Sequence, residues 1–207
     1  MFPLGTVLFP GAVLPVHVFE PRYRRMMYDC LDADRAFGVV LITRGSEVGG
    51  GDERVATGTE ARIEHATELP DGRWKLIARG VRRLRVASWL PDDPYPQALV
   101  ERVIGDDRAP QEDRLNEAVR TVRTALALVS ELGQGRVIDA PATADNDEEA
   151  VALAWRLCDV APLGPLDRQL LLQTDDPDAR LGTLIELTTH VVADLHRLLA
   201  SGGRDAE

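Results

Sequence analysis

The stretch LFPGAVLPVHVFEPRYRRMM, residues 8–27, decides how the first half of the chain folds, because it is apolar as far as Phe19 and then abruptly charged. It carries three prolines, although the interiors of strands and helices both disfavour proline. Pro10-Gly11 is a turn pair that separates two short runs of extended pattern, VLF at 7–9 and VLPVHVF at 13–19. We therefore predict two short strands joined by a tight turn.

The charged end of the same stretch predicts a helix that begins at Glu20-Pro21, because proline suits the first helical position. Apolar residues then recur at helical spacing and define one face, which comprises Tyr23, Met26, Met27, Cys30 and Leu31. Pro15 restricts the second strand to a sheet edge or a bulge. An export signal is not expected, because no basic segment precedes the apolar run and the prolines interrupt it.

Beyond this stretch, the pattern stays strand-like to about residue 105. Four further runs have the composition or alternation of strands, at 37–43, 58–69, 73–89 and 97–103. Asp71-Gly72 is a hairpin signal between two of them, and Gly80 inside the longest run predicts a bulge or bend. The glycine-rich segment 44–55 is expected to be a loop.

After residue 110 the apolar period becomes helical. Helices are predicted at 115–132, at about 147–161, from Gly164-Pro165 and from Asp176-Pro177 to Gly202, with a linker at 133–147. Strands followed by helices favour the α+β class over a doubly wound sheet. We expect a strongly bent sheet or pseudo-barrel with one inserted helix in residues 1–105, a helical bundle in 106–203, and a tail at 204–207.

Composition narrows the possible partners. The 207 residues are 44% hydrophobic and carry a formal net charge of −10, which suits a compact globular protein. The negative charge argues against non-specific binding to nucleic acid, which depends on neutralising phosphates.

Cys30 and Cys158 form no disulfide or zinc pattern, so a reducing, cytoplasmic setting is expected. No apolar run is long enough to predict a membrane span.

The sequence offers little for catalysis. Lys75, the single lysine, lies in a strand pattern rather than in a phosphate-binding loop, so ATP binding is not expected. No serine lies in a G-x-S-x-G turn, and the four histidines lack the spacing of metal ligands. A nucleophile at Cys30 paired with His17, or one at Ser46, is the least favoured hypothesis. We expect no enzyme activity, catalytic residue, metal or cofactor.

The densest basic cluster is ARGVRRLRV, which includes Arg82, Arg83 and Arg85. The favoured interpretation is a solvated strand face whose arginines pair with nearby acids. The alternative is a contact surface for phosphate, RNA or an acidic peptide, whose affinity would fall steeply with salt.

Several segments together resemble the N-terminal, substrate-binding domain of Lon proteases, and especially short bacterial proteins that consist of this domain alone. The matching segments are FPLGTVLFPGAVLPVHVFEPRYRRM (2–26), FGVVLI (37–42), EVGGGD (47–52), GTEARI (58–63), LPDGRWKL (69–76), GVRRLRV (80–86), PYPQALVE (94–101) and DRQLLLQTDDPDARLGTL (167–184). The resemblance implies a PUA-like β pseudo-barrel followed by helices. Lon's ATPase and peptidase modules have no counterpart in these segments, so peptidase activity is not carried over. Met1 directly precedes the first match, so the first strand is expected to be short or the start site late.

The resemblance also implies a role, which is to bind polypeptides or partner proteins, as an adaptor in proteolysis or quality control. We expect an exposed apolar patch to do so. Its expected members surround the proline-rich loop and comprise Phe9, Pro10, Val16, Phe19, Tyr23 and Met26. Plain core is the competing interpretation for each of them, and it is favoured for Tyr23 and Met26. The alternative function is a PUA-like small-ligand or RNA binder that uses Arg82, Arg83 and Arg85. The sequence predicts no oligomeric state.

Overall fold

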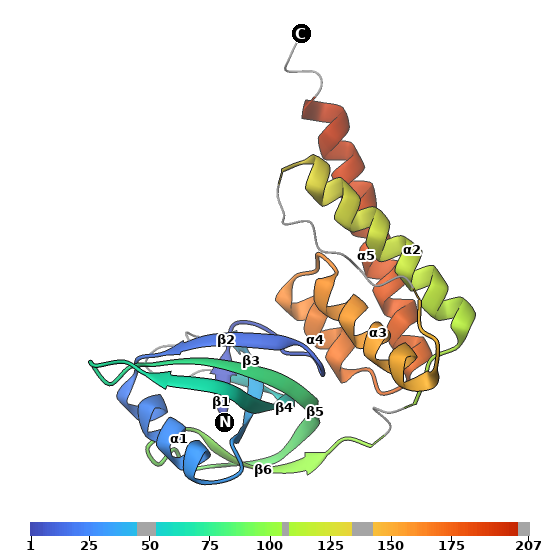
Figure 1. Cartoon of the computed structure of the whole chain (residues 1–207). Helices are drawn as coiled ribbons and strands as arrows, with labels where there is room; N and C mark the ends of the chain where they lie inside the picture. The colour runs from blue at the N-terminus through green and yellow to red at the C-terminus, as the bar shows by residue number, and fades with distance from the viewer. Residues whose placement is uncertain (45–52, 105–107, 134–142, 203–207) are drawn as a thin grey trace. The chain divides into compact units, whose positions relative to one another are not determined.

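The computed structural model describes residues 1–44, 53–104, 108–133 and 143–202 (Figure 1). The chain divides into two compact units, Met1–Asp106 and Asp107–Glu207. Most of the predicted glycine-rich loop, most of the predicted linker and the predicted tail lie outside the described residues. The two units are described separately below.

The first unit is a six-stranded sheet with one helix, and Figure 1 shows the sheet curling strongly. Its elements are β1 (Phe2–Leu4), β2 (Val13–Val18), α1 (Pro21–Asp32), β3 (Ala36–Arg44), β4 (Glu53–Glu68), β5 (Trp74–Leu90) and β6 (Gln97–Arg102). The strand order is β1-β3-β4-β5-β2, and β6 also pairs with β5. β1 runs parallel to β3, and every other pair is antiparallel.

The long strand β5 organises the sheet. β4 pairs with it along Trp74–Arg85, whereas β2 pairs with Trp74–Arg79 and β6 with Leu84–Leu90. The β4–β5 register shifts between Arg82 and Gly80, so Val81 is the extra residue of a bulge. The predicted irregularity at Gly80 is therefore confirmed.

The loop that contains Pro10-Gly11 packs against Gly80 and forms hydrogen bonds with it. Ala12 N–H donates to the carbonyl of Phe9 at 3.1 Å, and Gly11 has a φ of +80°, which closes a turn that needs glycine at its third position. Gly11 N–H donates to the Gly80 carbonyl at 2.8 Å, and Gly80 N–H donates to the Ala12 carbonyl at 2.9 Å. A Cβ atom on Gly80 would lie 2.2 Å from the Phe9 carbonyl oxygen, so the close approach requires glycine.

One predicted strand is wrong. Residues 7–9 are buried but belong to no strand, and the chain there is held by other contacts. Thr59 Oγ1 donates a hydrogen bond to the Leu8 carbonyl at 2.5 Å. A short apolar run indicates burial without fixing the backbone conformation, which is why the pattern misled.

The predicted helix is confirmed, since α1 begins at Pro21 and buries Tyr23, Met26 and Met27. These side chains join the core inside the curved sheet. Its buried members are Phe2, Leu4, Leu8, Val18, Tyr23, Met26, Met27, Phe37, Val39, Ala61, Ile63, Trp74, Leu76 and Ala78.

In its described residues, the second unit contains helices and no strands. Its helices are α2 (Glu112–Glu131), α3 (Asp147–Val160), α4 (Pro165–Gln173) and α5 (Pro177–Gly202). The Asn146 side chain caps α3 by accepting from Glu149 N–H at 3.0 Å, and Asp176 Oδ1 accepts from Ala179 N–H at 2.8 Å where α5 starts. Strands followed by a helical region confirm the predicted α+β fold.

A pocket between two edge strands

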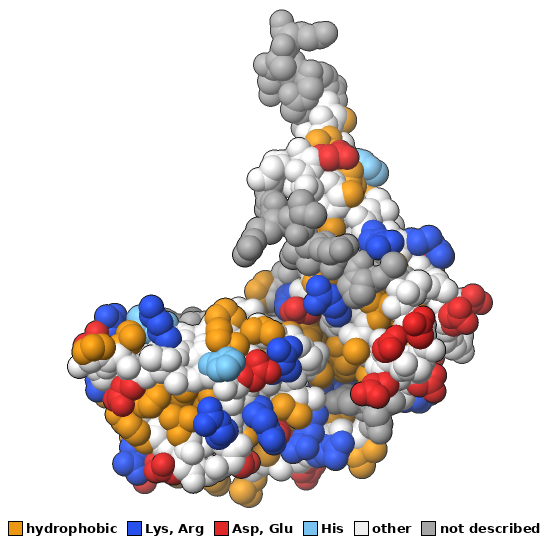
Figure 2. Space-filling model, viewed as in Figure 1, with side chains coloured by type: hydrophobic (Ala, Val, Ile, Leu, Met, Phe, Trp, Pro, Cys, Tyr) orange, Lys and Arg blue, Asp and Glu red, His pale blue; other side chains and the backbone are white. Residues whose placement is uncertain are grey.

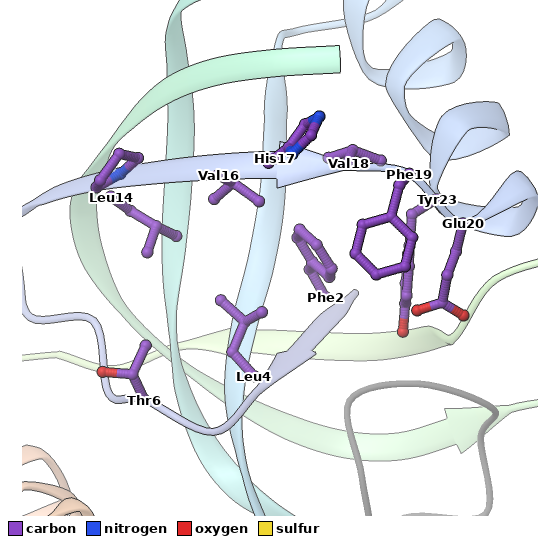
Figure 3. A pocket seen from close by; sticks show the side chains of 11 residues that line it. Phe2, Leu4, Thr6, Leu14, Val16, His17, Val18, Phe19, Glu20 and Tyr23 are labelled. Atoms are coloured by element: carbon purple, nitrogen blue, oxygen red, sulfur yellow. The ribbon is translucent and has the colours of Figure 1, made fainter. Parts of the chain in front are cut away.

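A hollow of about 290 Å³ lies between β1 and β2, the two ends of the strand order (Figure 3). The lining residues come from β1, the loop after it, β2 and the start of α1, and they are Phe2, Leu4, Thr6, Leu14, Pro15, Val16, His17, Val18, Phe19, Glu20 and Tyr23. Most of these side chains are apolar. The volume lies at the small end of ligand sites, which span about 300–1,000 Å³.

The sequence of β2 alternates between the two faces of the strand. Val18 is buried, and Leu14 and Val16 are partly buried against the core, whereas the intervening side chains are exposed. Figure 3 shows Phe2, Leu4 and Val16 pointing toward one another across the space between β1 and β2. In the described part of the chain, β2 pairs only with β5, so the prediction that Pro15 lies at a sheet edge is confirmed.

The junction between β2 and α1 forms one end of the pocket. Phe19 is 52% exposed, and its ring centroid lies 6.5 Å from that of His17. The Tyr23 ring lies 4.5 Å from the Phe2 ring, and the Arg22 guanidinium lies 4.6 Å over Tyr23. Arg22 Nε also donates to the Glu20 carboxylate at 3.1 Å. This end therefore presents an aromatic wall with an ion pair beside it.

The structure brings together three of the six residues expected to bind a polypeptide. Val16, Phe19 and Tyr23 line the same pocket. Phe9 and Met26 are 0% and 1% exposed and belong to the interior. Pro10 lies partly exposed in the turn, which is separate from the pocket lining. The binding role of this set stays a prediction, and its accessible part within the pocket is Val16 and Phe19.

Sequence reasoning missed Phe2, Leu4 and Leu14. Leu14 could have been found from the sequence, because it lies two residues before Val16 and therefore on the same face of the strand. Phe2 and Leu4 enter the pocket through the parallel pairing of β1 with β3, in which Phe2 lies opposite Val39. Nothing in the local pattern of residues 2–4 indicates that pairing.

Figure 2 shows hydrophobic side chains gathered over the part of the first unit where β1 and β2 lie, among side chains of both charges. Arg82, Arg83 and Arg85 of the basic cluster do not form a shared cationic surface. Arg83 is fully buried, Arg82 pairs with Glu60 at 2.6 Å, and Arg85 is exposed. The role of these arginines in anion binding stays a prediction, and the Arg82–Glu60 pair fits the favoured interpretation.

Nucleophilic chemistry finds little support in the described residues. Burial raises the pKa of the Cys30 thiol to about 11 and that of the Cys158 thiol to about 12, so both stay protonated near neutral pH. Ser46 lies outside the described residues. Among the residues the structure describes, no group of three His, Cys, Asp or Glu side chains is arranged to hold a metal ion. None of the described helices is long and apolar enough to cross a bilayer.

Comparison with known proteins gives a consistent result. The family described as the ATP-dependent protease La (LON) substrate-binding domain matches residues 1–190. Lon protease 2 of Herpetosiphon aurantiacus is 28% identical over 98% of this chain and 26% of that protein. Lon protease 2 of Myxococcus xanthus is 29% identical over 88% of this chain and 22% of that protein. The chain thus spans about a quarter of the length of these relatives.

Two solved structures extend the comparison to the fold. The Lon N-terminal domain protein from Xanthomonas campestris has a TM-score of 0.64 and 32% identity, over 89% of this chain and 95% of that one. The N-terminal domain of Mycobacterium avium complex Lon protease has a TM-score of 0.60 and 18% identity, over 90% and 96% of the two chains, and shows the shared fold.

Proposed function

Because this chain belongs to the family of Lon substrate-binding domains, we propose that it is a non-enzymatic module that binds polypeptides and acts as an adaptor in proteolysis. The observation that carries the proposal is the apolar pocket between β1 and β2, with Phe19 at its end. The family match supports a binding role, because it describes Lon's substrate-binding domain rather than its ATPase or peptidase modules.

The energetics of the pocket suit reversible capture. An aromatic side chain buries about 150–250 Å², and Phe19 is 52% exposed. A ligand that covers the exposed half of this side chain removes about 100 Å² from water, which is worth about 2.5 kcal/mol at about 25 cal/mol per Å². If a few neighbouring side chains each contribute a similar free energy of binding, the affinity stays low enough for the polypeptide to be released.

The proposal is tested with a labelled, permanently unfolded protein, carboxymethylated α-lactalbumin, whose binding is followed by fluorescence anisotropy. Val16→Glu places a carboxylate inside the pocket and should weaken binding at least tenfold. Val81→Glu is the matched control, because Val81 lies in the β5 bulge, is 41% exposed and does not line the pocket, and this variant should bind like the unmodified chain. Circular dichroism confirms that each variant is folded.

Phe19→Ser provides a second variant that does not threaten folding, because the side chain is already half exposed. It should weaken binding by a similar factor. Equal binding by the unmodified chain, Val16→Glu and Phe19→Ser would refute the pocket as the site. No binding by the unmodified chain would refute the proposed function itself.

The adaptor role needs its own assay. Degradation of the same unfolded protein by a Lon protease from the same cells should accelerate when the chain is added, and Phe19→Ser should remove the acceleration. A chain that binds the unfolded protein but leaves its degradation rate unchanged would refute the adaptor role and leave polypeptide binding intact.

A further inference from the structure

The pairing of β2 with β5 fixes which residues of β2 direct their backbone N–H and carbonyl groups toward β5. Gly80 N–H donates to the Ala12 carbonyl, and the register continues without a shift from Val13 opposite Arg79 to Val18 opposite Trp74. In an antiparallel pair, residues alternate between those that bond to the partner and those that bond to the other side. Leu14, Val16 and Val18 therefore direct their backbone groups toward β5.

The alternate residues of β2 direct their backbone groups toward the open edge. These residues are Val13, Pro15 and His17, and in the described residues no strand pairs with that edge. The edge thus offers the N–H and carbonyl groups of Val13 and His17, and the carbonyl of Pro15. Placing proline here is consistent with the rule that a strand proline faces away from the ladder.

We propose that an extended polypeptide segment binds by adding to this edge of β2 as a new antiparallel strand, with alternate side chains in the pocket between β1 and β2. The inference rests on the proposed function and specifies how the ligand is held. An unpaired sheet edge recognises the backbone of an extended chain, and neighbouring pockets select alternate side chains. Both requirements are met along the same six residues, Val13–Val18.

The geometry assigns different roles to the two sets of ligand residues. Residues opposite Val13, Pro15 and His17 bond to β2 through their backbone, and their side chains point away from the pocket. Residues opposite Leu14 and Val16 direct their side chains toward the pocket, where the lining is mostly apolar. The ligand should therefore carry apolar side chains at every second position and tolerate polar ones between them.

The backbone prediction is tested with the peptide acetyl-STVTFTVTS-amide, which presents Val, Phe and Val on one face and Thr on the other. One derivative carries N-methyl groups on the two threonine amides beside the phenylalanine. A second derivative, with the same number of methyl groups, carries them on the two valine amides. Binding to the full chain is measured by calorimetry, with competition against labelled carboxymethylated α-lactalbumin.

Strand addition predicts opposite results for the two derivatives. Methylation of the threonine amides removes donors to β2 and should weaken binding about tenfold or more, whereas methylation of the valine amides should leave binding within about twofold. Exchanging the Val and Phe side chains for Thr should abolish binding. A peptide of the same composition with its apolar residues contiguous should bind at least tenfold more weakly.

The alternative outcomes separate this inference from the proposed function. If both methylated peptides bind like the parent peptide, and Val16→Glu still weakens binding at least tenfold, strand addition is refuted and polypeptide binding stands. Strand addition is refuted in the same way if the unfolded protein binds through Val16 and the parent peptide does not bind. If neither ligand binds, both proposals fall. If sedimentation shows a dimer that Val16→Glu dissociates and that the peptide cannot displace, a second copy occupies the edge and the inference is refuted.

Discussion

Replacing Gly80 with alanine should destabilise the sheet unit by about 3 kcal/mol. The new Cβ atom would lie 2.2 Å from the Phe9 carbonyl oxygen and 3.2 Å from Thr59 Cγ2, so the backbone of the loop has to move. That movement breaks the two hydrogen bonds that join Gly80 to Gly11 and Ala12, each worth about 1 kcal/mol net. Strain from overpacking adds about 1 kcal/mol or more.

Hydrogen exchange measured by mass spectrometry reports this loss for the sheet unit alone. A decrease of about 3 kcal/mol accelerates exchange of the most protected amides in β4 and β5 about 100-fold. Gly164→Ala changes a glycine of the helical unit that lies in open space, so it should leave exchange in β4 and β5 unchanged. Gly11→Ala has space but a φ of +80°, so about 1 kcal/mol is expected. Acceleration below about fivefold for Gly80→Ala would refute the close-approach argument.

Three further predictions concern the thiols and the helical unit. At pH 8, iodoacetamide should react with Cys30 about 100-fold and with Cys158 about 1,000-fold more slowly in the folded chain than in urea, because burial raises their pKa values from 9.0 to about 11 and about 12. Rapid alkylation of either thiol would contradict its burial. The unfolded chain loses these protons first, so the free energy of unfolding should fall as the pH rises from about 9 to 11, and a flat urea midpoint over that range would disagree. Arg180→Ala should lower the free energy of unfolding of the helical unit by about 3 kcal/mol, because this buried guanidinium lies 3.7 Å over the Trp155 ring and donates to two backbone carbonyls. Arg197 is exposed, so Arg197→Ala should be nearly neutral. Urea unfolding measures both changes.

The fold was largely predictable because local signals agree with one another. Pro21 starts α1, Gly80 adjoins the β5 bulge, and Pro15 lies in an edge strand, each as proline and glycine chemistry requires. The misassigned run at 7–9 shows the limit. Its side chains are as buried as those of a strand, but the Leu8 carbonyl accepts a hydrogen bond from Thr59 and the Phe9 carbonyl packs closely against Gly80. Contacts with residues so distant in sequence leave no local trace.

The candidate site was predictable only in part. Phe19 is exposed because it follows the end of an alternating strand. Val16 points inward because it lies within that strand, on its buried face. The burial of Phe9 and Met26 depends on how the sheet curls over them, and the opposite pocket wall depends on β1 reaching β3 across more than thirty residues. Helical period correctly favoured the core for Met26, but neither period nor composition indicates the burial of Phe9 or the pairing that forms the opposite wall.

The proline in β2 bears on pairing between two copies of this protein. An open sheet edge is an aggregation hazard, and proline is one of the devices that reduce it. When two copies pair through β2, each brings Pro15, so the shared ladder lacks two N–H donors. A foreign segment without proline brings a full set of donors, and the ladder lacks only the donor missing from β2. Pro15 therefore weakens pairing between two copies of this edge more than it weakens pairing with another chain.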